Sequence, residues 1–185
     1  YLKVDFENDK QELFFGISDG PDLSGDFELE WGKSLVQFSP SLRVKEQKEK
    51  VVVKGWDPKQ KGEKREIKVE VDWDDLGVKL PDSKLLDEIK VSIKDSAENL
   101  VDQPVPNEAA ATELATGTLK RMIDKLITGR GSTVGMPSLR AGSKVELKGL
   151  GLRYSANYLV TESTHKIDNS GYTTQFSARM EVVSG

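Results

Sequence analysis

The sequence predicts a mainly β domain of the α+β class with one packed α-helix, and three observations support this prediction. Most of the chain alternates apolar and polar residues with period two, which is typical of half-buried strands. One stretch, about 107–127, has its apolar residues at helical spacing instead. Strand and helix patterns do not alternate along the chain, so a doubly wound α/β fold is not expected.

The strands follow from apolar stripes taken in chain order. Period-two or short continuous apolar stripes lie at 2–6, 13–17, 27–31, 51–56, 67–73, 145–147, 158–160 and 172–182. Val91 and Ile93 suggest one more short strand. The polar, glycine-containing segment 168–171 separates two of the stripes and predicts a hairpin loop.

The helical stretch has recognisable ends. Asn107 is suited to cap its N-terminus, and Gly129 is suited to its C-terminal end. Gly117 lies inside and costs about 1 kcal/mol relative to alanine. The polar segment 95–106 contains two prolines and predicts the main linker, and a shorter helical piece is expected at 82–89.

Composition excludes several kinds of site. Among the 185 residues there are 27 Lys and Arg against 31 Asp and Glu, no Cys and one His. Disulfides, thiolate metal sites and multi-histidine zinc sites are therefore excluded. No apolar run approaches the ~20 residues of a membrane helix. The densest basic stretch, 43–68, carries interleaved acidic residues, so we expect no nucleic-acid partner.

An acidic cluster at 72–75 suggests a calcium loop, but its spacing is wrong. An EF-hand loop that began at Asp72 would place Leu76 at its fifth position and Ser83 at its twelfth. Both positions must hold oxygen ligands. We therefore expect a charged turn at the end of a strand, and no bound metal.

The glycines at 129, 131 and 135 suggest a phosphate-binding loop, but the order of elements is wrong. A P-loop follows a strand and has Lys directly after its last glycine, whereas here a helix precedes the glycines. Ser143 also separates Gly142 from Lys144. We favour a flexible turn between the helix and the next strand, and no bound cofactor.

The single histidine, His165, lies near the end of a strand stripe. Ser163 and Asp168 are its neighbours in sequence, but strand alternation does not bring them into a catalytic arrangement with it. We expect a structural histidine and a protein that is not an enzyme.

A cell-wall carbohydrate-binding or hydrolytic module remains the alternative function. Trp31, Trp56 and Trp73 could stack on sugars, and a pair of carboxylates would suffice for glycoside hydrolysis. No signature selects such a pair, and packing is the simpler interpretation of the three tryptophans.

Several short motifs follow one another along the chain. They are LVQFSPSL at 35–42, VVVKGWDP at 51–58, GMPSLRAGSKV at 135–145 and YSANYLV at 154–160, followed by the single histidine and a Gly-Tyr pair at 171–172. This ordered set resembles the late control gene D family of phage tail proteins, which includes baseplate hub proteins and the N-terminal part of VgrG spikes. Ala156 stands where the family usually has glycine, and Ser163 where it usually has an apolar residue.

The resemblance implies a fold, a role and partners. The fold would be a tail-tube-like β-barrel with the helix covering one side. The protein would be a structural baseplate hub component of a contractile injection system, of the phage tail or type VI secretion kind, connecting tail tube to spike. Its partners would be further copies of itself, as a trimer in the full-length hub, the tail tube protein and a spike. It would assemble in the bacterial cytoplasm and reside in the virion tail, baseplate or injection particle.

The resemblance also divides the chain. Residues 1–33 would be strands that complete an upstream hub portion, and 34–185 the hub domain with its linker near 95–106. Because Tyr1 already lies in a strand-like pattern, we expect the chain to be the later portion of a longer hub. The motif residues expected to have structural roles are Pro40, Gly55, Trp56, Asp57, Pro58, Gly135, Pro137, Gly142, Tyr158, His165, Gly171 and Tyr172.

Overall fold

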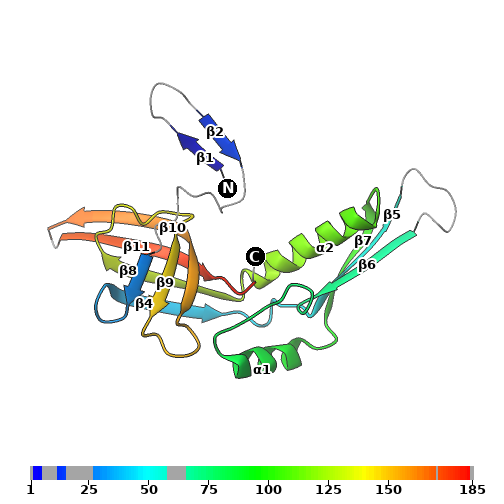
Figure 1. The fold of residues 1–185 in the computed structure, drawn as a ribbon, viewed down its shortest axis with the longest axis horizontal. Coiled ribbons are helices and arrows are strands. Elements are labelled where there is room, and N and C mark those ends of the chain that lie inside the picture. The colour runs from blue at the N-terminus through cyan, green and yellow to red at the C-terminus, as the bar shows by residue number, and fades with distance from the viewer. Residues whose placement is uncertain (1, 6–11, 16–26, 58–65, 170, 184–185) are drawn as a thin grey trace.

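The computed structural model describes residues 2–5, 12–15, 27–57, 66–169 and 171–183. The chain forms a curled sheet at one end of an elongated molecule and a smaller lobe of strands and helices at the other (Figure 1). This architecture confirms the predicted mainly β, α+β class.

The curled sheet has six strands and forms half a barrel (Figure 1). Its spatial order is β3-β9-β10-β11-β8-β4, and only the β3–β9 pair is parallel. The edge strands β3 and β4 are linked by a short turn with one bridge, between Trp31 and Leu35. The strands are β3 (Phe27–Glu30), β4 (Leu35–Leu42), β8 (Ile127–Val134), β9 (Lys144–Lys148), β10 (Ala156–Asp168) and β11 (Gly171–Met180).

The second lobe is inserted between β4 and β8, which are neighbours in the curled sheet. Its three-stranded sheet has the order β6-β5-β7, with β5 and β7 parallel. Its elements are β5 (Lys50–Trp56), β6 (Glu66–Asp72), α1 (Ser83–Ile93), β7 (Ala97–Pro104) and α2 (Glu108–Ile123).

Helix α2 is the predicted helix, but it does not cover the barrel as the resemblance implied. It packs against β5 and β6 of the inserted lobe. Ala111 and Ala115 are fully buried on its inner face, and such short side chains allow a helix to approach a sheet closely. Asn107 caps its first turn as predicted, accepting a hydrogen bond from the backbone N–H of Ala110 at 2.8 Å.

Three segments differ from the sequence predictions. The predicted linker near 95–106 contains β7, whose backbone groups pair with β5. Val91 and Ile93 belong to α1 and not to a strand, and Ile93 is buried with Leu85 and Ile89 at helical spacing. The glycine-rich segment after α2, predicted as a flexible turn, is β8, a strand between β4 and β11.

The N-terminal strands β1 (Leu2–Asp5) and β2 (Glu12–Phe15) pair with each other in antiparallel fashion. Strand β3 also falls within the predicted 1–33 unit, but it pairs with β9 in the curled sheet. The idea that residues 1–33 complete an upstream hub portion stays a prediction.

Buried side chains connect the two lobes. A continuous apolar core extends from Leu29 and Tyr158 in the curled sheet to Ile89 in α1. Polar contacts add to it, because Arg153 Nε in the β9–β10 loop lies 3.1 Å from Asp82 Oδ2 at the N-cap of α1. Hydrogen bonds to Asp82 from Leu85 N–H and Arg153 outweigh the opposing effect of burial and lower the pKa of its carboxyl group.

Candidate assembly surface

Three glycines in and just after β8 each lie against an aromatic ring from a neighbouring element. A Cβ atom would lie 2.2 Å from Phe38 if added at Gly129, 2.5 Å from Phe176 at Gly131, and 2.0 Å from Tyr172 at Gly135. These are closer than real Cβ contacts. The glycines therefore make room for rings that cross the sheet surface, which explains how a glycine-rich segment forms a strand.

Three of the predicted motif residues, Gly135, His165 and Tyr172, meet near the tip of the β10–β11 hairpin. Nδ1 of His165 lies 3.0 Å from the Tyr172 hydroxyl and 3.1 Å from Oγ1 of Thr174. The backbone N–H of Met136 donates to that same Thr174 Oγ1 at 2.9 Å, and the N–H of Gly135 donates to the carbonyl of Tyr172 at 2.9 Å. His165 thus joins β10 to β11, and Thr174 and Tyr172 of β11 in turn hold the loop after β8.

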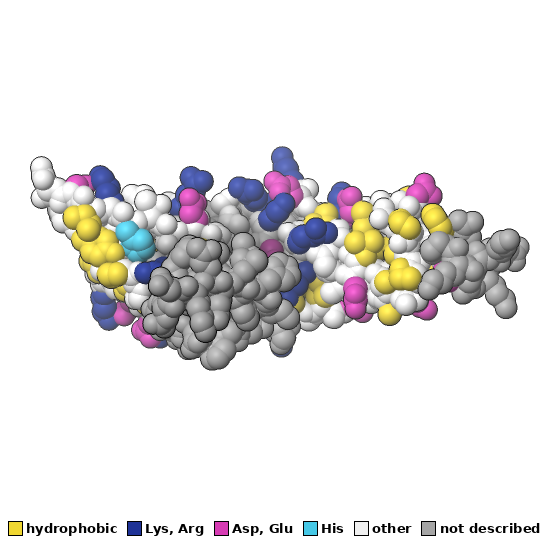
Figure 2. Space-filling view, turned by 90° about the horizontal axis from the view of Figure 1, so that it is seen from above, with side chains coloured by type: hydrophobic (Ala, Val, Ile, Leu, Met, Phe, Trp, Pro, Cys, Tyr) yellow, Lys and Arg dark blue, Asp and Glu magenta, His cyan; other side chains and the backbone are white. Residues whose placement is uncertain are grey.

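This end of the molecule also exposes apolar side chains. Ile167 is 79% exposed and Val134 54% exposed, and Met136 and Tyr172 are partly buried. We call these four residues with His165 the hairpin tip. Figure 2 shows hydrophobic side chains gathered beside the histidine near the left end of the molecule. Exposed apolar patches with polar surroundings are typical of protein contact sites.

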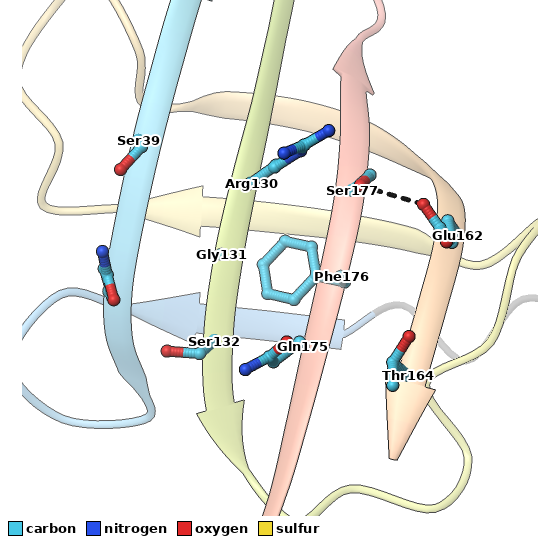
Figure 3. A pocket seen from close by; sticks show the side chains of 10 residues that line it. Ser39, Arg130, Gly131, Ser132, Glu162, Thr164, Gln175, Phe176 and Ser177 are labelled. Atoms are coloured by element: carbon cyan, nitrogen blue, oxygen red, sulfur yellow. Dashed lines mark hydrogen bonds between the residues drawn. The ribbon is translucent and has the colours of Figure 1, made fainter. Parts of the chain in front are cut away.

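The polar face of the curled sheet is hollowed along four strands, β4, β8, β11 and β10. The hollow measures about 500 Å³ (Figure 3). At one side of the hollow, Ser177 on β11 donates a weak hydrogen bond at 3.4 Å to Glu162 on the adjacent strand β10. It shares Ser39, Arg130 and Ser177 with a second hollow that continues towards α2, so we call the two together the polar furrow.

Other predicted motif residues lie within the curled sheet. Tyr158 is fully buried, its hydroxyl donates to the carbonyl of Tyr154 at 3.0 Å, and its ring meets that of Phe38 edge to face. Burial raises the pKa of Tyr158. Pro40 lies on the edge strand β4, where a residue without an N–H is tolerated. Gly142 has a φ of +92° in the turn before β9.

Pro137 and Gly171 lie in the two turns near the hairpin tip. The carbonyl of Pro137 accepts a long hydrogen bond from Arg140 Nε at 3.5 Å. Gly171 has a φ of +119°, a conformation that other residues rarely adopt, and it begins β11. Pro137 thus lies in the loop after β8, and Gly171 lies at the turn between β10 and β11.

The Gly-Trp-Asp-Pro motif lies far from the hairpin tip, at the end of β5 in the inserted lobe. A Cβ atom on Gly55 would lie 2.3 Å from the Gln103 carbonyl oxygen, next to a register shift between β5 and β7. Trp56 is partly buried and Asp57 is buried. Pro58 lies outside the described residues.

The three tryptophans do not share a surface. Trp73 is buried and its Nε1 donates to the Lys48 carbonyl at 2.7 Å. Trp56 lies at the opposite end of the β5–β6 pair, and Trp31, 48% exposed, lies beside the curled sheet. This arrangement provides no common platform for a sugar.

The acidic cluster 72–75 is a hydrogen-bonded turn. Oδ1 of Asp72 accepts from the N–H groups of Asp74 and Asp75, and Asp74 also pairs with Lys90 at 2.6 Å. Within the described residues, no group of three or more acidic or histidine side chains is placed to hold a metal ion. No helix there is long and apolar enough to cross a membrane.

The fold matches solved structures of phage tail proteins. A 43 kDa tail protein of prophage MuSo2 from Shewanella oneidensis has a TM-score of 0.61 at 14% identity, over 84% of this chain and 44% of that one. A tail protein from Neisseria meningitidis MC58 has a TM-score of 0.59 at 10% identity, over 89% of this chain and 46% of that one. The chain thus has the fold of part of a phage tail protein and spans less than half the length of either.

The sequence itself defines the family. Residues 19–169 match the Alg8 N-terminal domain, and the chain belongs to that family. No match is found among curated proteins. The resemblance to the late control gene D family stays a prediction.

Proposed function

We propose that this chain is a structural component of a phage tail or related contractile injection system, in which it forms part of the baseplate hub that connects tail tube to spike. The proposal rests mainly on the fold, which is similar to that of two tail proteins over more than four fifths of this chain. The late control gene D motifs support the narrower hub assignment, because several of them meet at the hairpin tip.

The hairpin tip is the proposed contact between subunits. Its exposed apolar side chains would be covered in an assembled ring, where burial of apolar area contributes about 25 cal/mol per Å². The proposed partners are further copies of the chain, as a trimer in the full-length hub, together with the tail tube protein and the spike. Such a role needs a rigid scaffold and no catalysis. Within the described residues, the side-chain hydrogen bonds of His165 go to the hydroxyl groups of Tyr172 and Thr174.

The test is to locate the full-length protein in purified particles. Gold-labelled antibodies raised against this chain should mark the junction between tube and spike, and mass spectrometry should find the protein in stoichiometric amount. Labelling along the whole tube would support a tail protein but reject the hub position. Absence of the protein from particles would reject the proposal altogether.

A paired comparison tests the contact surface within those particles. Ile167→Asp should prevent incorporation, because it places a charge in the covered contact. Val91→Asp is the matched control, because Val91 is 75% exposed on α1 in the other lobe and should not affect incorporation. Equal incorporation of the two variants would show that the hairpin tip is not a contact.

A further inference from the structure

The end of the polar furrow near α2 gathers positive charge on an acidic protein. The hollow there measures about 750 Å³ and is lined by five cationic side chains: Arg43, Arg121, Lys125, Arg130 and Arg179. Arg179 pairs with Asp124. In the described part of the chain, none of the other four forms an ion pair with a carboxylate.

These cations come together only in the fold. Arg43 follows β4, Arg121 and Lys125 lie in and just after the last turn of α2, and Arg130 lies on β8. Along the sequence they are separated by as many as 87 positions, counted from 43 to 130. We predicted no nucleic-acid partner from the mixed charges of the segment 43–68 alone. The cluster cannot be recognised in that segment, because its cations are spread along the sequence.

The rest of the described lining is rich in hydroxyl groups and has no aromatic or large aliphatic side chain. Ser39, Ser41, Thr128, Thr161 and Ser177 line the hollow together with the ion-paired Asp124, and among the described lining residues Ala178 is the one with an apolar side chain. Protein interfaces usually have aromatic or large apolar side chains at their centre. Arg, Lys, Ser and Thr are instead the side chains that contact phosphate groups in protein–DNA complexes.

We infer that the basic end of the polar furrow binds the sugar–phosphate backbone of double-stranded DNA without reading its sequence. Single-stranded nucleic acid is typically held by stacking on aromatic side chains, and none is found among the described residues that line this hollow. From Thr128 to Ser132 the furrow follows β8 for about 13 Å, at about 3.3 Å per residue. Glu162 lies beyond Arg130 and ends the run of positive charge.

The inference does not depend on the proposed hub function, and solution binding tests it directly. A fluorescently labelled 20-base-pair duplex is titrated with the protein at 50 mM and at 200 mM salt, and binding is followed by anisotropy. One phosphate contact for each of the four cations without an ion pair implies that affinity falls about 10²-fold between the two salt concentrations. Duplexes of unrelated sequence should bind equally well. Absence of binding at 50 mM salt, or sequence-dependent binding, would overturn the inference.

Charge reversal locates the site. Lys125→Glu combined with Arg130→Glu should abolish binding at 50 mM salt, because both side chains are exposed in the furrow and neither forms a side-chain ion pair in the described structure. Lys54→Glu combined with Lys84→Glu is the control, with the same change in net charge on exposed positions of the inserted lobe. The control should retain most of its affinity. Equal losses in the two double variants would show a general charge effect and reject the furrow as the site.

Competition distinguishes DNA from an acidic protein. Polyglutamate at equal charge concentration should displace the duplex poorly, because carboxylates spaced along a flexible chain do not reproduce the phosphate geometry. Displacement as effective as that by unlabelled DNA would assign the furrow to an acidic polypeptide and overturn the DNA inference. Circular dichroism melting of each variant confirms that it is folded.

Discussion

Replacing Gly129 with alanine should destabilise the curled sheet, because a ring already occupies the space of the new methyl group. The added Cβ atom would lie 2.2 Å from Cζ of Phe38 and 2.7 Å from its Cε2. Phe38 is buried and in edge-to-face contact with Tyr158, at a centroid distance of 5.5 Å, so the ring cannot simply swing into solvent. The φ of Gly129 lies outside the left-handed range, so alanine meets no backbone strain there.

The expected magnitude follows from two opposing effects. Forcing an extra methyl group into a packed core costs about 1–3 kcal/mol. Reduced freedom of the unfolded chain returns about 0.4–1 kcal/mol when glycine is replaced by alanine. The free energy of unfolding should therefore fall by about 1–2 kcal/mol. In a chain of this size that corresponds to a decrease in Tm of about 2–8 °C.

The assay is urea denaturation of a double-mutant cycle, followed by circular dichroism. In a Phe38→Ala background the methyl group has room, and Gly129→Ala should become neutral or stabilising. The coupling between the two substitutions should therefore be about 1–3 kcal/mol. Gly117→Ala is the matched control, because Gly117 is exposed on α2 with no atom within 4 Å of the added Cβ. It should stabilise the protein by about 0.5–1 kcal/mol.

Additive effects of Gly129→Ala and Phe38→Ala would refute the packing argument, because the cost of the methyl group would then not depend on the ring. Destabilisation by Gly117→Ala of similar size would show that the chain tolerates alanine poorly for a reason other than ring overlap.

Three further predictions concern single contacts. Tyr158→Phe should lower the free energy of unfolding by about 0.5–1.5 kcal/mol in denaturation, since it removes the hydrogen bond to the Tyr154 carbonyl; an unchanged midpoint would contradict this. Asn107→Ala should cost about 1 kcal/mol through loss of the α2 cap, whereas Asn107→Asp should cost much less. Hydrogen bonds from Lys68 and then Lys50 lower the pKa of Glu70 from its ordinary value of 4.5 to about 2, so its stabilising contribution is complete above about pH 4.5 and is lost as pH falls towards 2. Glu70→Gln should therefore flatten the stability curve in that window, and an NMR titration that gave Glu70 an ordinary pKa would contradict the prediction.

Local patterns were sufficient for much of the secondary structure. The stripe at 67–73 predicts β6 because alternate side chains of a strand face a core, and Val69 and Val71 are indeed buried. Asn107 and the alanine spacing predict α2 because capping and helical periodicity act within a few residues. The hairpin of β10 and β11 follows from the glycine-containing turn between two stripes.

Strand β8 shows where local patterns fail. Its sequence has few apolar side chains of its own. Its place in the sheet depends on Phe38 and Phe176, which pack over its glycines from the neighbouring strands β4 and β11. Both strands are far from β8 in the sequence. Strand β7 is similar, because its polar residues form a strand through backbone pairing with β5. In both cases the stabilising contacts come from partners that are far away in the sequence.

The sequence by itself determined the mainly β class, the capped helix α2 and the motifs that resemble a phage tail family, because these depend on periodicity and on residues close together in the chain. Only the tertiary structure decided that α2 packs on an inserted lobe, that Gly135, His165 and Tyr172 meet at the hairpin tip, and that four unpaired cations share one furrow. The physical reason is that packing and long-range charge act through space, where the fold brings together residues whose separation along the chain carries no such information.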